Sequence, residues 1–451
     1  MDFGARDERS INARLWTQVA RIAAVRYRGG SKRRRCAVSD HSLEQIPADE
    51  SGEAIEYPAL ILKRGEDARL RAGHLWVFSN EVDVQRSPLS AFTPGEICVI
   101  CDSQQHPIGI GYINPNSLIC ARLIVRGIEH AVDRSLLVHR LRVALGLRER
   151  LYAEPYYRLF YGESDGLPGL VLDRYGDVIV GQTTTAGTER LKDDIAAAVL
   201  KVIKPAAMVW KNDSGARTME SLPDYSEIAF GEITHPVIAR EGGLDFQIDP
   251  IDGQKTGWFY DQRANRDQLA PFVSGKRVLD MFSYLGGWGL RAAAMGASEV
   301  VCVDASASAV DAITRNAAAN GLSDRVTARK ADAFEELKRL REQRERFDVI
   351  ILDPPAFVKR KKDFAEGRLA YRRINEMAMQ LLAKDGILVT CSCSYHMSRT
   401  TLLEAVQQGA RHLDRQVQVL MQLQQAPDHP VHPAIVETDY LKGFICRVLP
   451  A

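Results

Sequence analysis

From Pro236 to the end of the chain, short apolar runs alternate with helical stretches, and this alternation limits the fold more than any other feature. Strands that alternate with helices form a mostly parallel sheet with helices on both faces, because each parallel connection needs a crossover. The expected strands are residues 277–281, 299–304, 325–330, 348–353 and 386–391. The sequence therefore predicts an α/β domain over residues 239–451.

Three other parts are expected ahead of this domain. Residues 1–57 include the basic run Lys32 to Arg35 and predict a disordered extension, with an RNA-attracting arm as the alternative. Residues 58–132 contain short apolar runs separated by Gly, Pro, Asn and Asp, which is typical of a small all-β domain. Residues 133–238 begin with a helical pattern and continue with strand-like runs around one helix at 189–204, which predicts a central α+β domain.

Composition indicates the compartment of the protein more clearly than it indicates a function. The net charge is only +1, so any nucleic-acid surface must be local. No apolar run approaches the roughly 18 residues of a membrane span, which predicts no membrane partner. The eight cysteines are scattered, which favours a reducing cytoplasm over a disulfide framework. Cys98 and Cys101 lack a second pair of ligands, so no metal site is expected.

A glycine-rich turn follows the first strand of the α/β domain. The strand ends near Asp280, and Gly286, Gly287 and Gly289 follow before the next helix. Glycine lets the backbone approach a ligand closely, and the place is that of a cofactor site in doubly wound sheets. The strict GxGxxG fingerprint of nicotinamide enzymes is absent. Asp304 and Asp332 follow the next two strands, where carboxylates can meet ribose hydroxyls and an adenine amino group.

The fourth strand ends in Asp353-Pro354-Pro355-Ala356-Phe357. Pro354 and Pro355 stiffen the loop, Asp353 can accept a hydrogen bond from a nucleobase amino group, and Phe357 can stack on a base. Such a loop would serve a methyltransferase of an exocyclic amine equally well. It therefore predicts a nucleobase site without naming the reaction.

The fifth strand ends in Thr390-Cys391-Ser392-Cys393-Ser394, next to the expected position of Asp353. Carbon 5 of cytosine is a poor nucleophile, and addition of a thiolate to carbon 6 makes an enamine that can attack an electrophilic methyl group. A cysteine at this place therefore favours carbon-5 methylation. Side chains two residues apart on a strand point to the same side, so the pattern does not choose between Cys391 and Cys393.

The series of acidic strand ends and the glycine turn resembles the S-adenosylmethionine site of class I methyltransferases. By that resemblance Asp304 binds the ribose, Asp332 the adenine side, and the glycine turn the methionine moiety. The cofactor-binding residues expected in this way are Asp280, Phe282, Tyr284, Gly286, Gly287, Gly289, Asp304, Asp332 and Ala333. We add Gln262 and Arg263, just ahead of the domain, because the segment Lys255 to Arg263 is expected to form a lid over cofactor or substrate rather than only a hairpin and the start of a helix.

Longer motifs resemble the bacterial large-subunit (23S) ribosomal RNA 5-methylcytosine methyltransferase family. They are the segments 253–263 (GQKTGWFYDQR) and 160–170 (FYGESDGLPGL), the loop 353–357, Ser392-Cys393-Ser394, and 440–444 (YLKGF). The resemblance runs from about residue 58 to the end. It implies a PUA RNA-binding domain, a central α+β domain and a Rossmann-like class I methyltransferase domain.

The same resemblance implies roles and partners. In the family the thiol lies within a Ser-Cys-Ser, which makes Cys393 the expected nucleophile and Asp353 its catalytic neighbour, with Pro354, Pro355 and Phe357 at the base. The implied cofactor is S-adenosylmethionine, and the implied partner is large-subunit ribosomal RNA. A homodimer stays open, because the sequence does not predict an oligomeric state.

Two other functions remain open from the sequence. One is an RNA methyltransferase of a guanine or adenine nitrogen that uses no covalent thiol. The other is a non-catalytic RNA-binding protein in which the PUA-like part matters and the methyltransferase domain is a scaffold, although the intact acidic strand ends argue against it. His429 and His432, in a Pro-rich loop, are expected to shape that loop rather than to act in catalysis.

Overall fold

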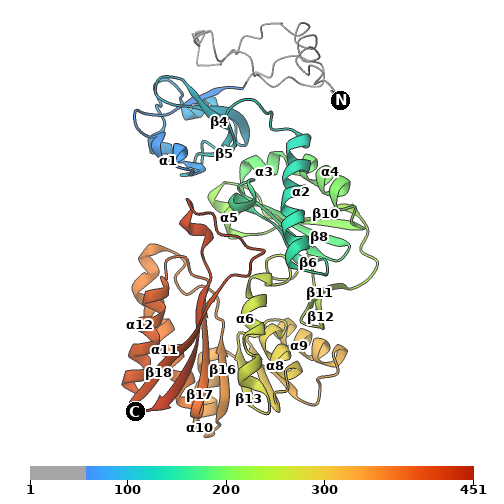
Figure 1. The fold of residues 1–451 in the computed structure, drawn as a ribbon, viewed down its shortest axis with the longest axis vertical. Helices are drawn as coiled ribbons and strands as arrows, with labels where there is room; N and C mark the ends of the chain where they lie inside the picture. The colour runs from blue at the N-terminus through green and yellow to red at the C-terminus, as the bar shows by residue number, and fades with distance from the viewer. Residues whose placement is uncertain (1–56) are drawn as a thin grey trace, which may run out of the picture. The chain divides into compact units, whose positions relative to one another are not determined.

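A computed structural model describes residues 57–451 (Figure 1), and these fall into two compact units that divide between Leu136 and Leu137. The extension expected over residues 1–57, with its basic run, lies outside the described residues apart from Tyr57. The second unit contains the residues expected as the central domain together with those of the α/β domain. The domain limits expected at residues 132 and 238 stay predictions.

The first unit is a five-stranded sheet in the order β1-β3-β4-β5-β2. Its core consists of alternate strand residues such as Leu60, Cys98 and Ile100, with Leu70 from the short helix α1. Cys98 and Cys101 are buried free thiols, and no group of three His, Cys, Asp or Glu within residues 57–451 could hold a metal ion. The elements are β1 (Ala59–Ile61), α1 (Ala68–Arg71), β2 (Trp76–Val77), β3 (Glu96–Cys101), β4 (Pro107–Ile113) and β5 (Ala121–Arg126).

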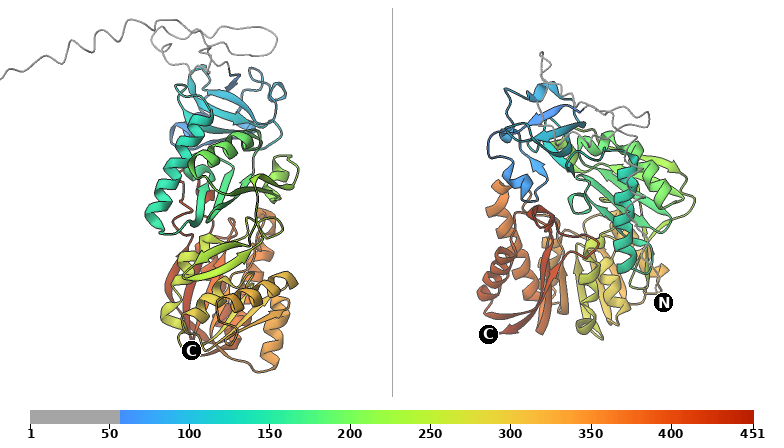
Figure 2. Two further views of the ribbon diagram at one scale, coloured as in Figure 1. Left: turned by 90° about the vertical axis from the view of Figure 1, so that its right-hand side faces the viewer. Right: turned by 45° about the horizontal axis from the view of Figure 1, so that its top comes forward.

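The division between the units falls in the first turn of the helix α2 (Arg134–Leu151), which continues in the second unit beside a sheet of order β10-β9-β8-β7-β6 (Figure 2). The single helix expected at 189–204 is two helices, because Leu191 has φ −91° and ψ 4° and interrupts the helical backbone. The remaining elements are β6 (Tyr156–Tyr161), β7 (Leu170–Tyr175), β8 (Val178–Thr183), α3 (Ala186–Arg190), α4 (Lys192–Val202), β9 (Ala207–Asn212), α5 (Gly215–Met219) and β10 (Tyr225–Gly231).

A seven-stranded sheet of order β15-β14-β13-β16-β17-β19-β18 forms the rest of the second unit. The five expected strands are present and parallel, whereas β19 runs antiparallel to both of its neighbours. The strands are β13 (Arg277–Met281), β14 (Glu299–Asp304), β15 (Val326–Lys330), β16 (Phe347–Leu352), β17 (Leu382–Ser392), β18 (Arg415–Gln424) and β19 (Lys442–Pro450). A two-stranded hairpin, β11 (Val237–Glu241) and β12 (Leu244–Ile248), precedes them.

Helices cover both faces of this sheet, as expected for a doubly wound fold. Leu290 and Ile313, from α8 and α9, pack on one face, and Tyr371 and Leu402, from α11 and α12, pack on the other with α10 (Figure 1). The helices are α6 (Arg263–Asp267), α7 (Ala270–Val273), α8 (Gly287–Ala294), α9 (Ala307–Ala319), α10 (Ala333–Glu342), α11 (Phe364–Leu381) and α12 (Arg399–His412). None of the helices within residues 57–451 is both long and apolar enough to cross a membrane.

Candidate active site

The principal cavity lies where the strand order reverses. β13 pairs with β14 on one side and with β16 on the other. At such a reversal of strand order, a crevice forms outside the carboxyl ends of the strands. The cavity has a volume of about 600 Å³. Its walls include the expected residues Gln262, Phe282, Tyr284, Gly287, Asp304, Asp332, Asp353, Pro354, Pro355, Phe357 and Cys393.

The turn after β13 is held in an unusual backbone conformation. Phe282 and Tyr284 have φ of 62° and 51°, in the left-handed region that non-glycine residues rarely adopt. Gly286, with φ 88°, caps α8, and a Cβ at Gly289 would lie 2.3 Å from the sulfur of Cys302. Strain of this kind persists only where surrounding structure enforces it, and it gathers at ligand sites.

The two acidic strand ends lie in the cavity wall, and both also have structural partners. Asp304 accepts hydrogen bonds from the backbone of Tyr284 and of Ser306, each at 2.9 Å. Asp332 caps α10 by accepting from the backbone of Phe334 and Glu335. A carboxylate can accept about four hydrogen bonds, so each retains capacity for a ligand.

The cavity fits S-adenosylmethionine in size and chemistry. Its volume is within the roughly 300–1,000 Å³ of small-molecule sites. Asp304 and Asp332 offer acceptors for ribose hydroxyls and an adenine amino group, and Phe282 and Phe334 offer aromatic surface nearby. The start of α8 at Gly287 lies in the same wall.

Asp353 is held from two directions. The side-chain amide of Gln262 donates to both of its oxygens at 3.0 Å, and the indole N–H of Trp288 donates to one of them at 3.0 Å. Burial raises the pKa of Asp353, while the bonds from Trp288 and Gln262 oppose this shift. Gln262, which we expected to contact the cofactor, therefore orients the carboxylate of Asp353 in the cavity wall.

The structure separates the two thiols that the sequence pattern left equivalent. Cys391 is fully buried within the core of the sheet, and burial raises its pKa well above the usual value. Cys393 lines the cavity. The difference arises because β17 ends at Ser392, so the alternation of strand side chains does not extend to Cys393.

The serines on either side of Cys393 fix the loop. The Ser392 hydroxyl donates to the phenol oxygen of Tyr371 at 2.8 Å, and the Ser394 hydroxyl lies 3.1 Å from the same phenol. The ammonium of Lys442 donates to the Ser394 carbonyl at 2.8 Å. These bonds fix the thiol position through its neighbours.

Burial raises the pKa of the Cys393 thiol, and the carboxylates of Asp353 and Asp261 raise it further, whereas the Lys255 ammonium lowers it. The thiol is thus close to two negative charges and one positive charge. An added positive charge in the cavity would favour the thiolate.

Some expected residues lie outside the cavity. Arg263 is not in its wall and stacks over Tyr152 and Tyr260, 4.5 and 5.0 Å from the ring centroids, so its expected role in a lid stays a prediction. Asp280 lies beneath the turn, where it accepts from the Gly289 backbone at 2.9 Å, and burial raises its pKa to about 7. Gly286, Gly289 and Ala333 are not in the cavity wall either.

Several wall residues were not expected from the sequence. They are Lys255, Trp258, Phe259, Asp261, Arg266, Trp288 and Phe334. Lys255 to Asp261 belong to the segment 255–263, which we expected to form a lid, but these residues had no individual roles assigned. Trp288 and Phe334 lie in the first turns of α8 and α10, beside residues that we expected.

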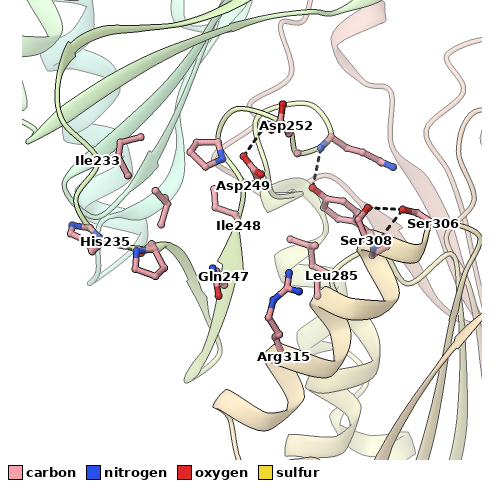
Figure 3. Close-up of a pocket in the computed structure, with 18 residues that line it drawn as sticks. Ile233, His235, Gln247, Ile248, Asp249, Asp252, Leu285, Ser306, Ser308 and Arg315 are labelled. Atoms are coloured by element: carbon pink, nitrogen blue, oxygen red, sulfur yellow. Dashed lines mark hydrogen bonds between the residues drawn. The ribbon is translucent and has the colours of Figure 1, made fainter.

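A second cavity of about 380 Å³ lies next to the first and shares Gln254 and Tyr284 with it. Figure 3 shows Ser306, Ser308 and Arg315 of α9 on one side and Ile233 and His235 on the other. The Tyr284 phenol donates to the Gly257 carbonyl at 3.1 Å and accepts from the Gln254 backbone. Tyr284 therefore forms a fixed wall between the two cavities.

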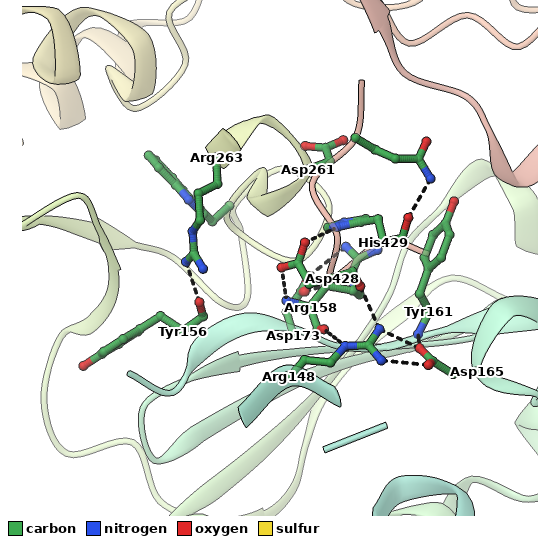
Figure 4. A network of polar contacts seen from close by, with 12 residues as sticks. Arg148, Tyr156, Arg158, Tyr161, Asp165, Asp173, Asp261, Arg263, Asp428 and His429 are labelled. Atoms are coloured by element: carbon green, nitrogen blue, oxygen red, sulfur yellow. Dashed lines mark hydrogen bonds and ion pairs between the residues drawn. The ribbon is translucent and has the colours of Figure 1, made fainter. Parts of the chain in front are cut away.

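Within the second unit, a buried polar network joins α2 and the sheet β10-β9-β8-β7-β6 to the loop between β18 and β19 (Figure 4). Arg148 forms a two-pronged ion pair with Asp165 at 2.7 Å and donates to the Asp428 carbonyl. Asp428 accepts from the ring of His429 at 2.8 Å and from the backbone of Arg158 at 3.0 Å. His429 thus shapes the loop, as expected.

Comparison with known proteins matches two families. Residues 223–442 match the S-adenosylmethionine-dependent methyltransferase family, and residues 60–126 match a PUA-like domain. Ribosomal RNA large subunit methyltransferase I of Shewanella denitrificans is 37% identical over 393 residues, which cover 86% of this chain and 98% of that protein. Its namesake in Aeromonas hydrophila is 37% identical over 396 residues, which cover 86% and 99%.

Two solved structures share the fold over most of the chain. A methyltransferase complexed with SAH, SMU.776, has a TM-score of 0.74 at 21% identity, with 86% of this chain and 99% of that chain covered. An S-adenosylmethionine-dependent methyltransferase from Streptococcus mutans has a TM-score of 0.73 at 20% identity and the same coverage. The expected α/β methyltransferase fold with a PUA-like domain is confirmed.

Proposed function

We propose that this chain, which belongs to the family of ribosomal RNA large subunit methyltransferase I, methylates carbon 5 of a cytosine in large-subunit ribosomal RNA through a covalent Cys393 adduct. The chain is an S-adenosylmethionine-dependent methyltransferase. The cytosine target and the covalent route are the parts that we propose. The observation that supports them best is the Cys393 thiol in the cavity wall beside Asp353.

The PUA-like domain and the basic run after the catalytic loop support an RNA substrate. Lys359, Lys361 and Lys362 follow directly on Phe357 and are exposed. None of these three side chains forms an ion pair within residues 57–451. Unpaired cations next to a nucleobase site suit a phosphate backbone, since neutralised phosphates release counterions.

In the proposed reaction each of the residues in the cavity wall has a separate role. S-adenosylmethionine, when bound, supplies an electrophilic methyl group and a positive sulfonium. Asp304 and Asp332 hold its adenosine part, and Asp353, oriented by Gln262 and Trp288, accepts from the cytosine amino group. Cys393 adds to carbon 6 as the thiolate, which makes carbon 5 nucleophilic.

A mechanism-based trap tests the proposal. RNA with 5-fluorocytosine at the target has no proton to lose from carbon 5, so it should remain covalently attached to the protein on a denaturing gel. We expect a band with the unmodified protein and with Cys391→Ala, and no band with Cys393→Ala. A band that is lost with Cys391→Ala instead would reverse the assignment. An active protein that gives no band would favour methylation of a guanine or adenine nitrogen.

A further inference from the structure

Asp261 lies in the cavity wall, and one of its carboxylate oxygens has no hydrogen-bond partner within residues 57–451. The residue is 5% exposed, lies in the cavity wall with Cys393, and accepts a hydrogen bond from the phenol of Tyr440 on Oδ2. Oδ1 is buried and has no hydrogen-bond partner among residues 57–451. Leaving a buried acceptor unsatisfied costs about 1–3 kcal/mol, so such an atom in a native site needs a reason.

The surroundings favour the ionised carboxylate. Burial alone would raise the pKa of Asp261, but Lys255, His429 and the Tyr440 hydrogen bond outweigh burial and hold that pKa below its usual value. His429 is fixed by its bond to Asp428 at 2.8 Å in the buried network of Figure 4, where Asp261 lies close by. Asp261 is therefore an ionised acceptor that is held in place in the cavity wall.

The proposed reaction needs one proton acceptor that the residues named so far do not supply. After the methyl group is on carbon 5, the proton on that carbon must leave before Cys393 can be released. Asp353 accepts from Gln262 on both oxygens and from Trp288 on one, and in the proposed reaction it also holds the cytosine amino group. The Tyr440 hydroxyl keeps its proton and donates a hydrogen bond to Asp261, so the phenol does not act as a base.

We propose that Oδ1 of Asp261 accepts the carbon 5 proton and so resolves the covalent intermediate. The electron pair of the C–H bond forms the double bond between carbons 5 and 6. The bond between carbon 6 and sulfur breaks, and its electron pair returns to Cys393 as the thiolate. The proton moves to the carboxylate, so no further reactant is needed. This inference depends on the proposed function, because without a carbon 6 adduct there is no proton to remove.

The test uses Asp261→Asn, ordinary cytosine RNA and S-adenosylmethionine labelled in its methyl group. The amide cannot take the proton, so methyl transfer should occur once and a labelled protein–RNA adduct should accumulate on a denaturing gel. Turnover should fall by roughly 10²- to 10⁴-fold, the usual contribution of a general base. The unmodified protein should show no such adduct. The matched control is Asp385→Asn, at an exposed ion pair with Arg447, which should behave like the unmodified protein.

The outcomes separate the two proposals. If the unmodified protein does not trap 5-fluorocytosine RNA, the proposed function fails. If it does trap that RNA, yet Asp261→Asn turns over normally or makes no labelled adduct, the role of Asp261 is wrong. Asp261→Ser, which also lacks a base, should give the same labelled adduct, and it replaces the asparagine variant if that does not fold. Asp261→Glu should release at least part of the product.

Discussion

The half of the cavity that we propose for the cofactor and the half that we propose for the base are built in different ways. In the cofactor half, Asp304 and Asp332 follow successive parallel strands, and their oxygens accept hydrogen bonds from backbone groups of the adjoining turn and helices. In the base half, Asp261, Asp353 and Cys393 come from three distant segments, and side chains hold them. The cofactor half is thus formed by the ends of neighbouring strands, and the base half is formed by packing between segments that are distant in the sequence.

The largest effect that would test this comparison is expected in the cofactor half. Asp304→Ala should weaken S-adenosylmethionine binding by roughly 10- to 100-fold, because hydrogen bonds to a charged group contribute about 1.5–3 kcal/mol. Calorimetry measures the affinity. Asp311→Ala, on the exposed side of α9, is the matched control and should bind normally. Unchanged binding in Asp304→Ala would mean that the ribose assignment is wrong.

In the base half we expect a separate loss of turnover. Gln262→Leu removes both amide bonds to Asp353, and because those bonds lower the pKa of Asp353, that pKa should rise further. The rate of methyl transfer should fall by about 10-fold, the effect of about 1.4 kcal/mol on the barrier, while cofactor affinity stays within about twofold.

Gln268→Leu is the control for that experiment, since its amide contacts only the Ala264 carbonyl at 3.5 Å. Single-turnover kinetics with labelled cofactor measure the rate, and calorimetry measures the affinity. If Gln262→Leu weakened cofactor binding and left the rate of methyl transfer normal, Gln262 would belong to the cofactor half and the proposed division of the cavity would be wrong.

The smallest effect is expected at the rim of the base half. Replacing Lys361 and Lys362 by alanine should lower the slope of log affinity against log salt by about 1.4, since each phosphate contact of a single strand contributes about 0.7. RNA affinity at moderate salt should fall only several-fold, and cofactor affinity should not change. Lys338→Ala with Lys384→Ala is the control pair, on exposed positions of α10 and β17. An equal change of slope in both double variants would mean that Lys361 and Lys362 do not contact the RNA.

Most of the cofactor half could be predicted from the sequence because its geometry is local. An apolar run ends in a carboxylate, glycines follow, and parallel strands bring their carboxyl ends to one edge. This logic placed Asp304, Asp332 and Gly287 in the wall, as the structure has them. It does not predict the direction of Arg263, whose side chain packs on Tyr152 and Tyr260, because tertiary contacts rather than position in the motif set that direction.

The antiparallel edge of the sheet is a second feature that the sequence pattern did not predict. The alternation of strands and helices predicted the five parallel strands but not β18 and β19, which close the sheet as an antiparallel pair. The loop between them brings Tyr440 to Asp261 and Asp428 to Arg148. A pattern of crossovers does not predict a final hairpin, because antiparallel strands need no crossover.

The sequence by itself determined the parallel sheet, the acidic strand ends, the glycine turn and the presence of two thiols after the fifth strand. Tertiary structure decided which thiol reaches the cavity, that Gln262 holds Asp353, and that one oxygen of Asp261 has no partner in the part of the chain from residue 57 onward. The reason is physical: strand and turn preferences act over a few residues, whereas burial and hydrogen bonding between distant segments depend on how the whole chain packs.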